Sequence, residues 1–414
     1  MKLIYNLFIW LYPIVARLIS GQNEKAKLWV EGRKDIFDKL KTAFKSNTSK
    51  VIWIHCSSLG EFEQGRPLME GIKANDASSK ILLTFFSPSG YEVRKNYEGA
   101  DWIFYLPMDS LSNAKKFFSI VKPNLIIFVK YEFWFYYLQE AKMQNIKTIL
   151  ISGVFRSSQP FFKWYGNFNR TTLQFFSWLF VQNNISVELL KGIGLEKNVT
   201  VSGDTRFDRV ITIANQFEPI PIIELFIGNF NKVVVAGSTW LEDDEELHHY
   251  TIAHPDIKFI IAPHDIQKSR IEECTKLYPE AITFSQIKEI SHTKLIKSNV
   301  MIIDNIGMLS KLYHYATICF VGGGFGGDGV HNVLEAAVYG KPIVFGEEYS
   351  KYREAIELVE EEGAFSVKNI PELETVLNKL FSDKEYYNRT CEIASEYVQS
   401  NAGATDVILK YLKL

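Results

Sequence analysis

Short apolar runs alternate with longer amphipathic stretches along most of the chain. Seven runs rich in β-branched and aromatic residues come first, at 51–58, 80–87, 101–107, 124–131, 146–153, 178–184 and 198–204. Five more follow at 232–239, 257–264, 300–305, 316–324 and 341–346. Strand-length runs separated by helical patterns are typical of parallel α/β sheets. We therefore expect two doubly wound sheets, one after the other.

A proline-containing segment separates the two series of runs. It spans residues 213–226 and contains Pro219 and Pro221, which interrupt the alternation of strands and helices. Two α/β domains joined near residue 220 would place a cleft between the carboxyl ends of their sheets, where ligands normally bind. The residues at the strand ends are therefore the candidates for chemistry.

The N-terminus carries a different pattern, a continuous apolar run from Leu7 to Ala16 between Asn6 and Arg17. Residues 1–50 also carry ten Lys and Arg against four acids. No small-residue cleavage site follows the run, which argues against a signal peptide. The pattern favours a helix that crosses a bilayer marginally or lies in its interface, next to an anionic cytoplasmic leaflet. A buried N-terminal helix with a basic flank is the alternative.

Composition and charge exclude several classes of protein. A net charge of −2 argues against bulk nucleic-acid binding, and 47% hydrophobic residues fit a globular fold. The four cysteines lie far apart without a C-x-x-C pair, so we expect a reducing compartment and neither a disulfide framework nor a zinc site. The sequence has no H-E-x-x-H motif, and the acidic run 242–246 is interpreted as helix capping and a solvated face. We expect a metal-free mechanism without a cofactor.

Three charged residues follow strands of the first series. Glu61 falls where a helix begins near Gly60, and it is either a general base or a charge favoured by the helix N-terminus. Glu132 stands among aromatic residues, as a partly desolvated site carboxylate or an ordinary surface acid. Arg206 is suited to bind a phosphate or carboxylate, or else pairs structurally with Asp204 or Asp208.

A glycine-rich segment follows a strand of the second series. Five of the six residues from 322 to 327 are glycine, including Gly323 and Gly324, and a helical pattern with Glu335 follows. Glycines let a backbone approach a ligand, and a helix N-terminus favours phosphate, so we expect a nucleotide or phosphate site here. Two other strand ends, Pro263-His264 and Ile306-Gly307-Met308, are weaker candidates for the same site.

The motifs occur together in the order of one known family. They are HCSSLGEFEQGRPL, KYEFWF, SGDTRFD, AGSTWLEDDEEL, APH and GGGFGGDGVHNVLEAAVYGKPIVFG, and they follow an apolar N-terminus. The chain resembles the 3-deoxy-D-manno-octulosonic acid (Kdo) transferases of lipopolysaccharide assembly. The resemblance implies a glycosyltransferase B fold, with two Rossmann-like domains facing a cleft and an N-terminal membrane helix.

The resemblance also implies a division of the chain and a cellular location. We expect a membrane-attachment helix at 1–20, an acceptor-binding domain at 21–215 and a CMP-Kdo-binding domain at 216–390. The remaining residues, 391–414, would form a helix that packs back on the N-terminal domain. The catalytic domains would lie on the cytoplasmic face of the inner membrane, and the partners would be CMP-Kdo, a lipid A precursor and the membrane surface.

Roles transfer from the family residue by residue. The general base falls on Glu61, and the transition-state stabilisers fall on Glu132 and Arg206, where many relatives have Lys. Contacts to the nucleotide sugar fall on Pro263, His264, Ile306, Gly307, Met308, Gly323, Gly324, Asn332, Val333, Leu334 and Glu335. A displacement with a base and no enzyme nucleophile implies inversion at C2 of Kdo.

This chain departs from the family at two positions of the nucleotide pocket. Many relatives read Pro-Arg-His where this chain has Pro263-His264-Asp265, and Gly-Glu where it has Gly307-Met308. Other interpretations stay open: a UDP-sugar transferase, a nonhydrolysing sugar-nucleotide epimerase, or a non-catalytic, membrane-tethered nucleotide-binding protein.

Overall fold

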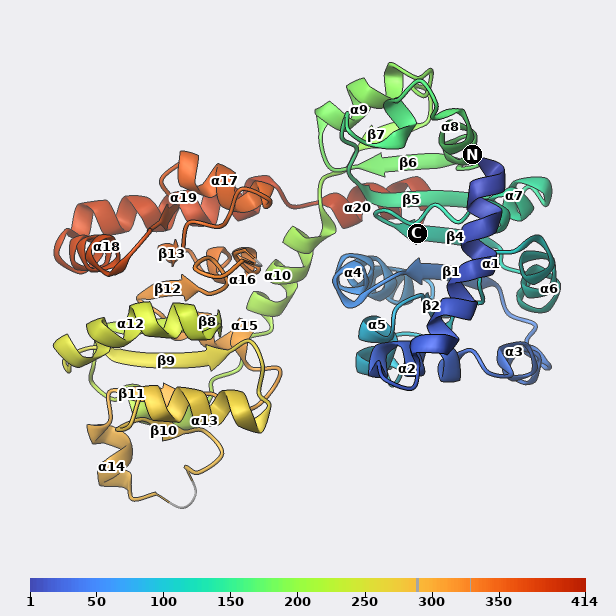
Figure 1. The fold of residues 1–414 in the computed structure, drawn as a ribbon. Helices are drawn as coiled ribbons and strands as arrows, with labels where there is room; N and C mark the ends of the chain where they lie inside the picture. The colour runs from blue at the N-terminus through green and yellow to red at the C-terminus, as the bar shows by residue number, and fades with distance from the viewer. Residues whose placement is uncertain (288–289, 328) are drawn as a thin grey trace. The chain divides into compact units, whose positions relative to one another are not determined.

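The computed structural model describes residues 1–287, 290–327 and 329–414. The chain forms two compact units, unit 1 with Met1–Arg209 and Ala402–Leu414, and unit 2 with Val210–Asn401. Each unit is built on one seven-stranded parallel sheet flanked by helices (Figure 1). The expected pair of doubly wound α/β domains is confirmed.

The sheet of unit 1 has the strand order β3-β2-β1-β4-β5-β6-β7. Its strands are β1 (Val51–Cys56), β2 (Lys80–Phe85), β3 (Trp102–Tyr105), β4 (Leu125–Val129), β5 (Lys147–Gly153), β6 (Trp178–Val181) and β7 (Val199–Val201). Its helices are α1 (Lys2–Ile19), α2 (Glu24–Gly32), α3 (Ile36–Phe44), α4 (Leu59–Asn75), α5 (Pro88–Arg94), α6 (Leu111–Val121), α7 (Phe135–Met143), α8 (Asn167–Leu173), α9 (Asn184–Lys191) and α20 (Ala404–Leu412), with a 3-10 turn at Pro160–Phe162.

Successive residues of a unit 1 strand belong to two different cores. Val51 and Trp53 of β1 pack on one face of the sheet, whereas Ile52 and Ile54 pack on the other with Phe62 of α4. A parallel strand covered by helices on both faces is apolar at nearly every position. This double burial explains why these strands are continuous apolar runs rather than alternating patterns.

Helix α1 lies along unit 1 (Figure 1). It buries one narrow stripe of side chains against that unit. Tyr5, Ile9, Tyr12 and Ala16 form this stripe at helical spacing, and the Tyr5 hydroxyl donates a hydrogen bond to buried Asp109. Most of the remaining positions are apolar and uncovered, and only 11% of the residues from Lys2 to Ile19 are buried. The alternative of a buried N-terminal helix is therefore not supported.

The sheet of unit 2 has the order β10-β11-β9-β8-β12-β13-β14. Its strands are β8 (Val233–Thr239), β9 (Lys258–Pro263), β10 (Ile282–Thr283), β11 (Val300–Ile302), β12 (Ile318–Val321), β13 (Ile343–Phe345) and β14 (Ala364–Ser366). Its helices are α11 (Pro221–Ile227), α12 (Leu241–Ala253), α13 (Lys268–Leu277), α14 (His292–Lys297), α15 (Leu309–Leu312), α16 (Leu334–Ala337), α17 (Arg353–Glu360), α18 (Ile370–Ser382) and α19 (Lys384–Ser400), with a 3-10 turn at Tyr313–Tyr315. The edge strands β10 and β14 were not predicted, because no long apolar run surrounds either of them.

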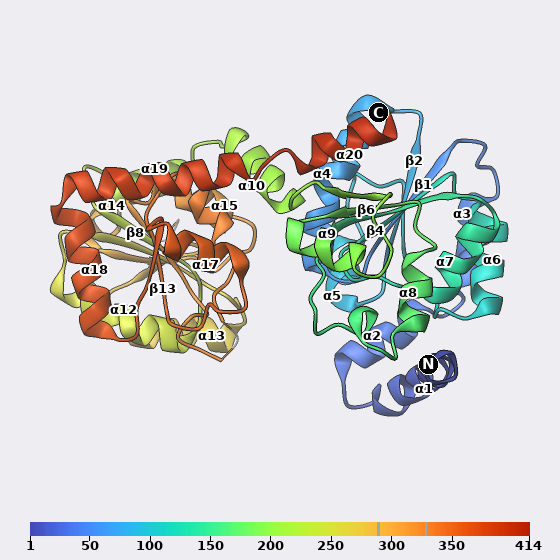
Figure 2. The same ribbon diagram turned by 90° about the horizontal axis from the view of Figure 1, so that it is seen from above.

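The division between the units differs from the predicted boundary at 215/216. It falls between Arg209 and Val210, inside helix α10 (Thr205–Asn215). At the other end of the chain, α19 remains with unit 2, and only residues from Ala402 onward belong to unit 1. There α20 packs against α4 (Figure 2). The Asp208 carboxylate holds this segment by accepting hydrogen bonds from the backbone N–H groups of Gly403 (2.6 Å) and Thr405 (2.7 Å).

Candidate functional site

The strand order of unit 1 brings Glu61 and Glu132 to the same edge of the sheet. Strands β1 and β4 are neighbours, although two strands lie between them in the sequence, so the order of the sheet reverses at this pair. Glu61 follows β1 at the start of α4, and Glu132 follows β4. Ligands of doubly wound sheets bind outside the carboxyl ends of the strands at such a switch point.

Glu61 is buried in the first turn of α4, as the prediction of a helix near Gly60 requires. Its carboxylate accepts a hydrogen bond from the backbone N–H of Ser57. Burial raises the pKa of Glu61 to about 8, and the negative charge of Glu132 adds to this shift. The Ser57 amide and the charge of Lys130 oppose it. The result is a carboxyl group that binds a proton unusually tightly.

Glu132 is also buried, but nitrogen donors surround one of its oxygens. His55 Nε2 lies 3.1 Å from Glu132 Oε2, and the indole N–H of Trp134 donates to the same oxygen. Hydrogen bonds from N–H groups stabilise the ionised form of a carboxylate. The interpretation of Glu132 as an ordinary surface acid is therefore wrong.

Arg206 lies in the first turn of α10. It pairs with Asp204, which is one of the two structural partners predicted from the sequence. Its Nε donates to Asp204 Oδ2 at 2.9 Å, and its backbone N–H donates to Asp204 Oδ1 at 2.9 Å. Burial alone would raise the pKa of Asp204, but the Arg206 charge and hydrogen bonds bring it below the usual value. Asp204 also accepts hydrogen bonds from Gln64 and Gln182, so this ion pair is anchored in unit 1.

Sequence reasoning missed three residues of this site: His55, Lys130 and Trp134. Lys130 follows β4 with a φ of 62°, a backbone conformation that is uncommon for a side-chain-bearing residue. Its charge lowers the pKa values of both Glu61 and Asp204, so it acts on both carboxylates. Lys130 and Trp134 lie in the quoted KYEFWF motif, and His55 lies in HCSSLGE, yet only tertiary contacts reveal their roles.

The predicted nucleotide contacts of unit 2 follow its central strands. Strands β8 and β12 are adjacent and form the switch point of this sheet. Pro263 ends β9, and His264 follows it with its ring stacked on Trp240 (centroids 4.6 Å apart) and on His331 (4.4 Å). Trp240 Nε1 also donates to His331 Nε2 at 3.1 Å. These three rings form one stacked aromatic cluster that individual motifs do not predict.

The glycine-rich loop after β12 is held by an acid that we expected to be solvated. Asp243 is fully buried; it accepts hydrogen bonds from the backbone N–H groups of Gly323 (2.7 Å) and Trp240 (2.8 Å). Burial raises the pKa of Asp243 to about 6 despite these donors. Its neighbour Asp244 is also fully buried and pairs with Arg270. The prediction of capping is confirmed, but a solvated face is wrong for these two residues.

Close packing and backbone conformation explain why glycine occupies two positions of this loop. A Cβ on Gly322 would lie 2.4 Å from the carbonyl oxygen of Ser238, and Gly323 has a φ of 91°. The helix expected after the loop is also shorter than its pattern predicts, since α16 contains only four residues. A single turn has little macrodipole, so the argument for phosphate binding at a helix N-terminus is weakened here.

The remaining predicted contacts differ in exposure. Ile306 is 83% exposed in the turn after β11, where Gly307 has a φ of 93° and Met308 precedes α15. Val333 and Leu334 are fully buried, so their side chains belong to the core. Asn332 Nδ2 donates to Glu335 Oε1 at 2.9 Å, which orients that carboxylate.

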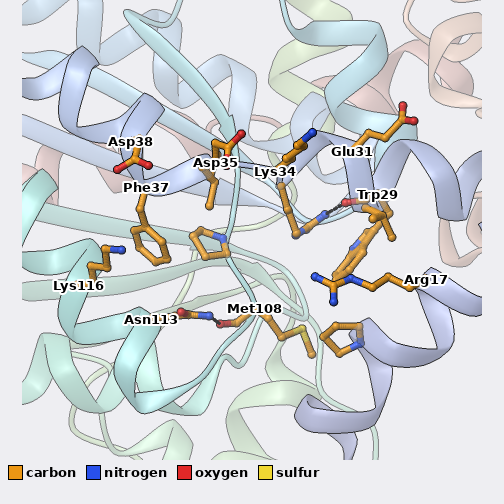
Figure 3. A pocket seen from close by; sticks show the side chains of 15 residues that line it. Arg17, Trp29, Glu31, Lys34, Asp35, Phe37, Asp38, Met108, Asn113 and Lys116 are labelled. Atoms are coloured by element: carbon orange, nitrogen blue, oxygen red, sulfur yellow. Dashed lines mark hydrogen bonds between the residues drawn. The ribbon is translucent and has the colours of Figure 1, made fainter.

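A pocket of about 620 Å³ lies elsewhere in unit 1, and its lining contains none of the predicted site residues. Arg17 and Trp29 lie on one side of it, and Phe37 and Lys116 on the other (Figure 3). It is therefore a surface feature of the N-terminal helices. Within the described residues, no group of three or more His, Cys, Asp or Glu side chains is placed to hold a metal ion.

Comparison with known proteins agrees with the motifs. The family model described as 3-deoxy-D-manno-octulosonic-acid transferase (kdotransferase) matches residues 34–209. The chain is 28% identical over 359 residues to the 3-deoxy-D-manno-octulosonic acid transferase of Aquifex aeolicus, covering 84% of this chain and 92% of that protein. It is also 28% identical over 353 residues to a bifunctional glycosyltransferase/methyltransferase of Fusobacterium nucleatum. That match covers 81% of this chain and 54% of the relative, so the chain spans about half of that protein's length.

Solved structures share the fold at lower identity. UDP-GlcNAc 2-epimerase from Neisseria meningitidis aligns with a TM-score of 0.62 and 18% identity, covering 88% of this chain and 99% of that chain. This similarity establishes the two Rossmann-like units and nothing about the substrate. The resemblance inferred from the motifs is confirmed: residues 34–209 match the Kdo transferase family model, and the similarity to Kdo transferases extends over most of the chain.

Proposed function

We propose that this protein is an inverting, metal-independent glycosyltransferase that moves Kdo from CMP-Kdo to a lipid A precursor, lipid IVA, in lipopolysaccharide biosynthesis. One observation carries the proposal: two buried carboxyl groups, Glu61 and Glu132, lie together at the switch point of the unit 1 sheet. The segment that holds them also matches the Kdo transferase family model.

Glu61 is the general base of the proposed reaction. A carboxylate with a pKa of about 8 is a much stronger base than an ordinary glutamate, and this pKa is close to neutral pH. Glu61 takes the proton from a sugar hydroxyl of the acceptor as that oxygen attacks C2 of Kdo. A single displacement of this kind inverts the configuration at C2.

Glu132 and Arg206 act on the charges that develop during the displacement. Departure of CMP leaves positive, oxocarbenium-like charge at C2. A carboxylate held in place by His55 and Trp134 stabilises that charge without rearranging. The Arg206 guanidinium, oriented by Asp204, is the cation proposed for the departing phosphate.

The donor nucleotide is proposed to bind at the carboxyl edge of the unit 2 sheet. The stacked rings of Trp240, His264 and His331 offer a surface for a base or phosphate. Glu335 has a carboxylate that can accept hydrogen bonds from a ribose diol. Its pairing with Asn332 fixes the side chain for that contact.

Helix α1 is proposed to lie in the interface of the cytoplasmic leaflet of the inner membrane. Its stripe of Tyr5, Ile9, Tyr12 and Ala16 packs on unit 1, so the helix is held along the domain. Its other faces are apolar and exposed, and cations including Arg17 and Lys116 line the neighbouring pocket (Figure 3). An apolar surface beside cations suits an anionic bilayer and an acceptor that is itself an anionic lipid.

The test is mass spectrometry of lipid IVA after incubation with purified full-length protein and CMP-Kdo in the presence of EDTA. We expect the wild type to add at least one Kdo. Glu61→Gln should lose at least about 100-fold in turnover, the lower range for removing a general base. Its affinity for CMP-Kdo should stay within about threefold, because the proposed donor contacts lie in unit 2.

Glu63→Gln is the matched control on the same helix, since Glu63 pairs with Arg94 and Arg209 rather than facing Glu132. It should keep turnover near the wild-type value. Absence of any Kdo transfer, together with activity on a UDP-sugar, would overturn the proposal in favour of another transferase or an epimerase. Equal activity of Glu61→Gln and wild type would favour a different base.

A further inference from the structure

A chain of buried hydrogen bonds leads from the core of unit 1 to Glu132. Trp53 Nε1 donates to Thr84 Oγ1 at 2.8 Å, Thr84 Oγ1 lies 2.8 Å from His55 Nδ1, and His55 Nε2 lies 3.1 Å from Glu132 Oε2. Trp53, Thr84 and His55 are all fully buried. The parallel register places His55 of β1 directly beside Thr84 of β2 and Phe128 of β4, so three adjacent strands fix the chain.

The donor at one end of this chain and the carboxylate at the other favour one direction for the bonds between them. An indole N–H can only donate, so the Thr84 oxygen accepts from Trp53. The hydroxyl hydrogen of Thr84 is then free to donate to His55 Nδ1, the one acceptor that the described contacts offer it. The imidazole hydrogen then lies on Nε2 and points at Glu132 Oε2. The indole N–H of Trp134 also lies 3.1 Å from His55 Nε2, but its shorter contact is to Glu132 Oε2, and an unprotonated Nε2 would set its lone pair against that carboxylate oxygen.

An imidazolium would not fit these contacts as well. It would carry a second hydrogen on Nδ1, aimed at the same Thr84 oxygen, and the described contacts give the Thr84 hydroxyl no other acceptor. The surroundings of the ring are also fixed, since His55 lies edge-on to Phe128 with centroids 5.6 Å apart. The geometry thus selects a neutral imidazole with one defined tautomer.

We propose that His55 is a positioning residue for Glu132, with its Nε2–H tautomer set by Thr84 and Trp53. Together with Trp134, it saturates one oxygen of Glu132 and keeps that carboxylate fixed and charged beside Glu61. This inference rests on the proposed function for the part that Glu132 plays in transfer. A neutral donor is what the role requires, because an imidazolium would cancel the negative charge meant for C2.

The first experiment tests the tautomer and needs no activity. In full-length protein with ¹⁵N-labelled histidine, the imidazole signals of His55 are assigned by their loss in His55→Gln. We expect the pattern of a neutral Nε2–H ring at pH 7, and Thr84→Val should alter it because the hydroxyl donor to Nδ1 is gone. An Nδ1–H ring or an imidazolium at pH 7 would overturn the inference whether or not the protein transfers Kdo.

The second experiment measures kinetics with four variants in two matched pairs. His55→Leu removes the donor, whereas the amide of His55→Gln can replace Nε2–H. We expect turnover to fall about 100-fold in His55→Leu, as for loss of one preorganised donor, and to recover at least tenfold in His55→Gln. Thr84→Val should lose turnover and Thr84→Ser should retain it. In all four, the KM for CMP-Kdo should stay within about twofold, because the proposed donor contacts lie in unit 2.

The pH profile separates positioning from a general loss of structure. His55→Leu removes a hydrogen bond that stabilises the negative charge of Glu132. Because that charge raises the pKa of Glu61, the pH midpoint of turnover should move downward, while the thermal transition stays cooperative. Wild-type turnover in His55→Leu overturns the inference. So does an equal loss in His55→Leu and His55→Gln with an unshifted pH midpoint, which indicates a structural role. If the wild type transfers no Kdo, the proposed function fails, and the tautomer measurement still decides the assignment of His55.

Discussion

Glu61 and Glu132 carry the same functional group in different surroundings. Glu61 is buried beside another negative charge, which favours its protonated form, whereas one oxygen of Glu132 contacts the ring nitrogens of His55 and Trp134. Pairs of titratable groups with different environments divide acid–base work between them. At the residue scale, the two carboxyl groups of the site therefore suit different roles.

The pH dependence of turnover follows from this difference. A base must be ionised to accept a proton, so kcat/KM should rise with pH to a midpoint near pH 8, the pKa of Glu61, and level off above it. In Glu132→Gln the neighbouring charge is gone, so the midpoint should fall by about one pH unit or more and the plateau should be lower. Initial rates between pH 5.5 and 9.5 measure both, with Glu63→Gln as the control. A midpoint that is the same in wild type and Glu132→Gln would contradict the electrostatic coupling.

At the scale of elements, side chains from other parts of the chain hold the loops that follow the strands. Asp243 opens α12, yet it accepts hydrogen bonds from the loop after β12, so the acidic run and the glycine-rich run form one structure. Helix α1 packs on unit 1 by one stripe only, and its other faces are uncovered. Its most exposed large hydrophobic side chains are Leu3 (84%) and Leu18 (79%).

The exposed face of α1 predicts membrane binding. Changing Leu3 and Leu18 to Gln should weaken flotation with vesicles containing anionic lipid by about tenfold or more, since burying a leucine is worth about 1.5–3 kcal/mol. The melting temperature should not change, because neither side chain packs on unit 1. The matched control changes Ile185 of α9 and Ile252 of α12, which are 69% and 68% exposed, to Gln, and it should bind like the wild type. Equal binding of both double variants would show that α1 is not the membrane surface.

At the scale of the whole molecule, the chain leaves unit 1 through α10 and returns to it at residue 402. Asp208 lies near the point of departure and accepts three hydrogen bonds from Gly403 and Thr405 on the return. The Leu409 side chain of α20 then packs over Gly71 of α4, where a Cβ would lie 2.7 Å from it. The C-terminal segment is thus an integral part of unit 1.

Removing the Asp208 charge should weaken the attachment of the C-terminal segment to unit 1. Asp208→Asn loses acceptor capacity for buried N–H groups, which costs about 1–3 kcal/mol. We expect faster release of peptides cut at Lys410 in limited trypsin digestion, followed by mass spectrometry, and a lower melting temperature. Asp406→Asn, at an exposed position of α20, is the control and should digest like the wild type. Identical digestion of the Asp208 variant would show that α20 is held by apolar packing alone.

Much of the fold could be predicted from the sequence, but less of the site. The central strands were found because double burial makes every position apolar, while β10 and β14 stand outside any long apolar run. The start of α4 was predicted near Gly60 from local residues, and the helix begins at Leu59. The burial of Asp243 and Asp244 was missed, because their partners lie about 80 and 26 residues away.

The sequence by itself determined the two-sheet architecture, the apolar N-terminal helix and the resemblance to Kdo transferases, because these depend on short-range patterns and on motifs. Only the tertiary structure decided the strand order that sets β1 beside β4, and with it the meeting of Glu61 and Glu132. The tertiary structure also decided the surroundings of each carboxyl group. Burial and hydrogen-bond donors depend on which distant segments become neighbours, as His55 shows by joining Thr84, 29 residues away, to Glu132, 77 residues away.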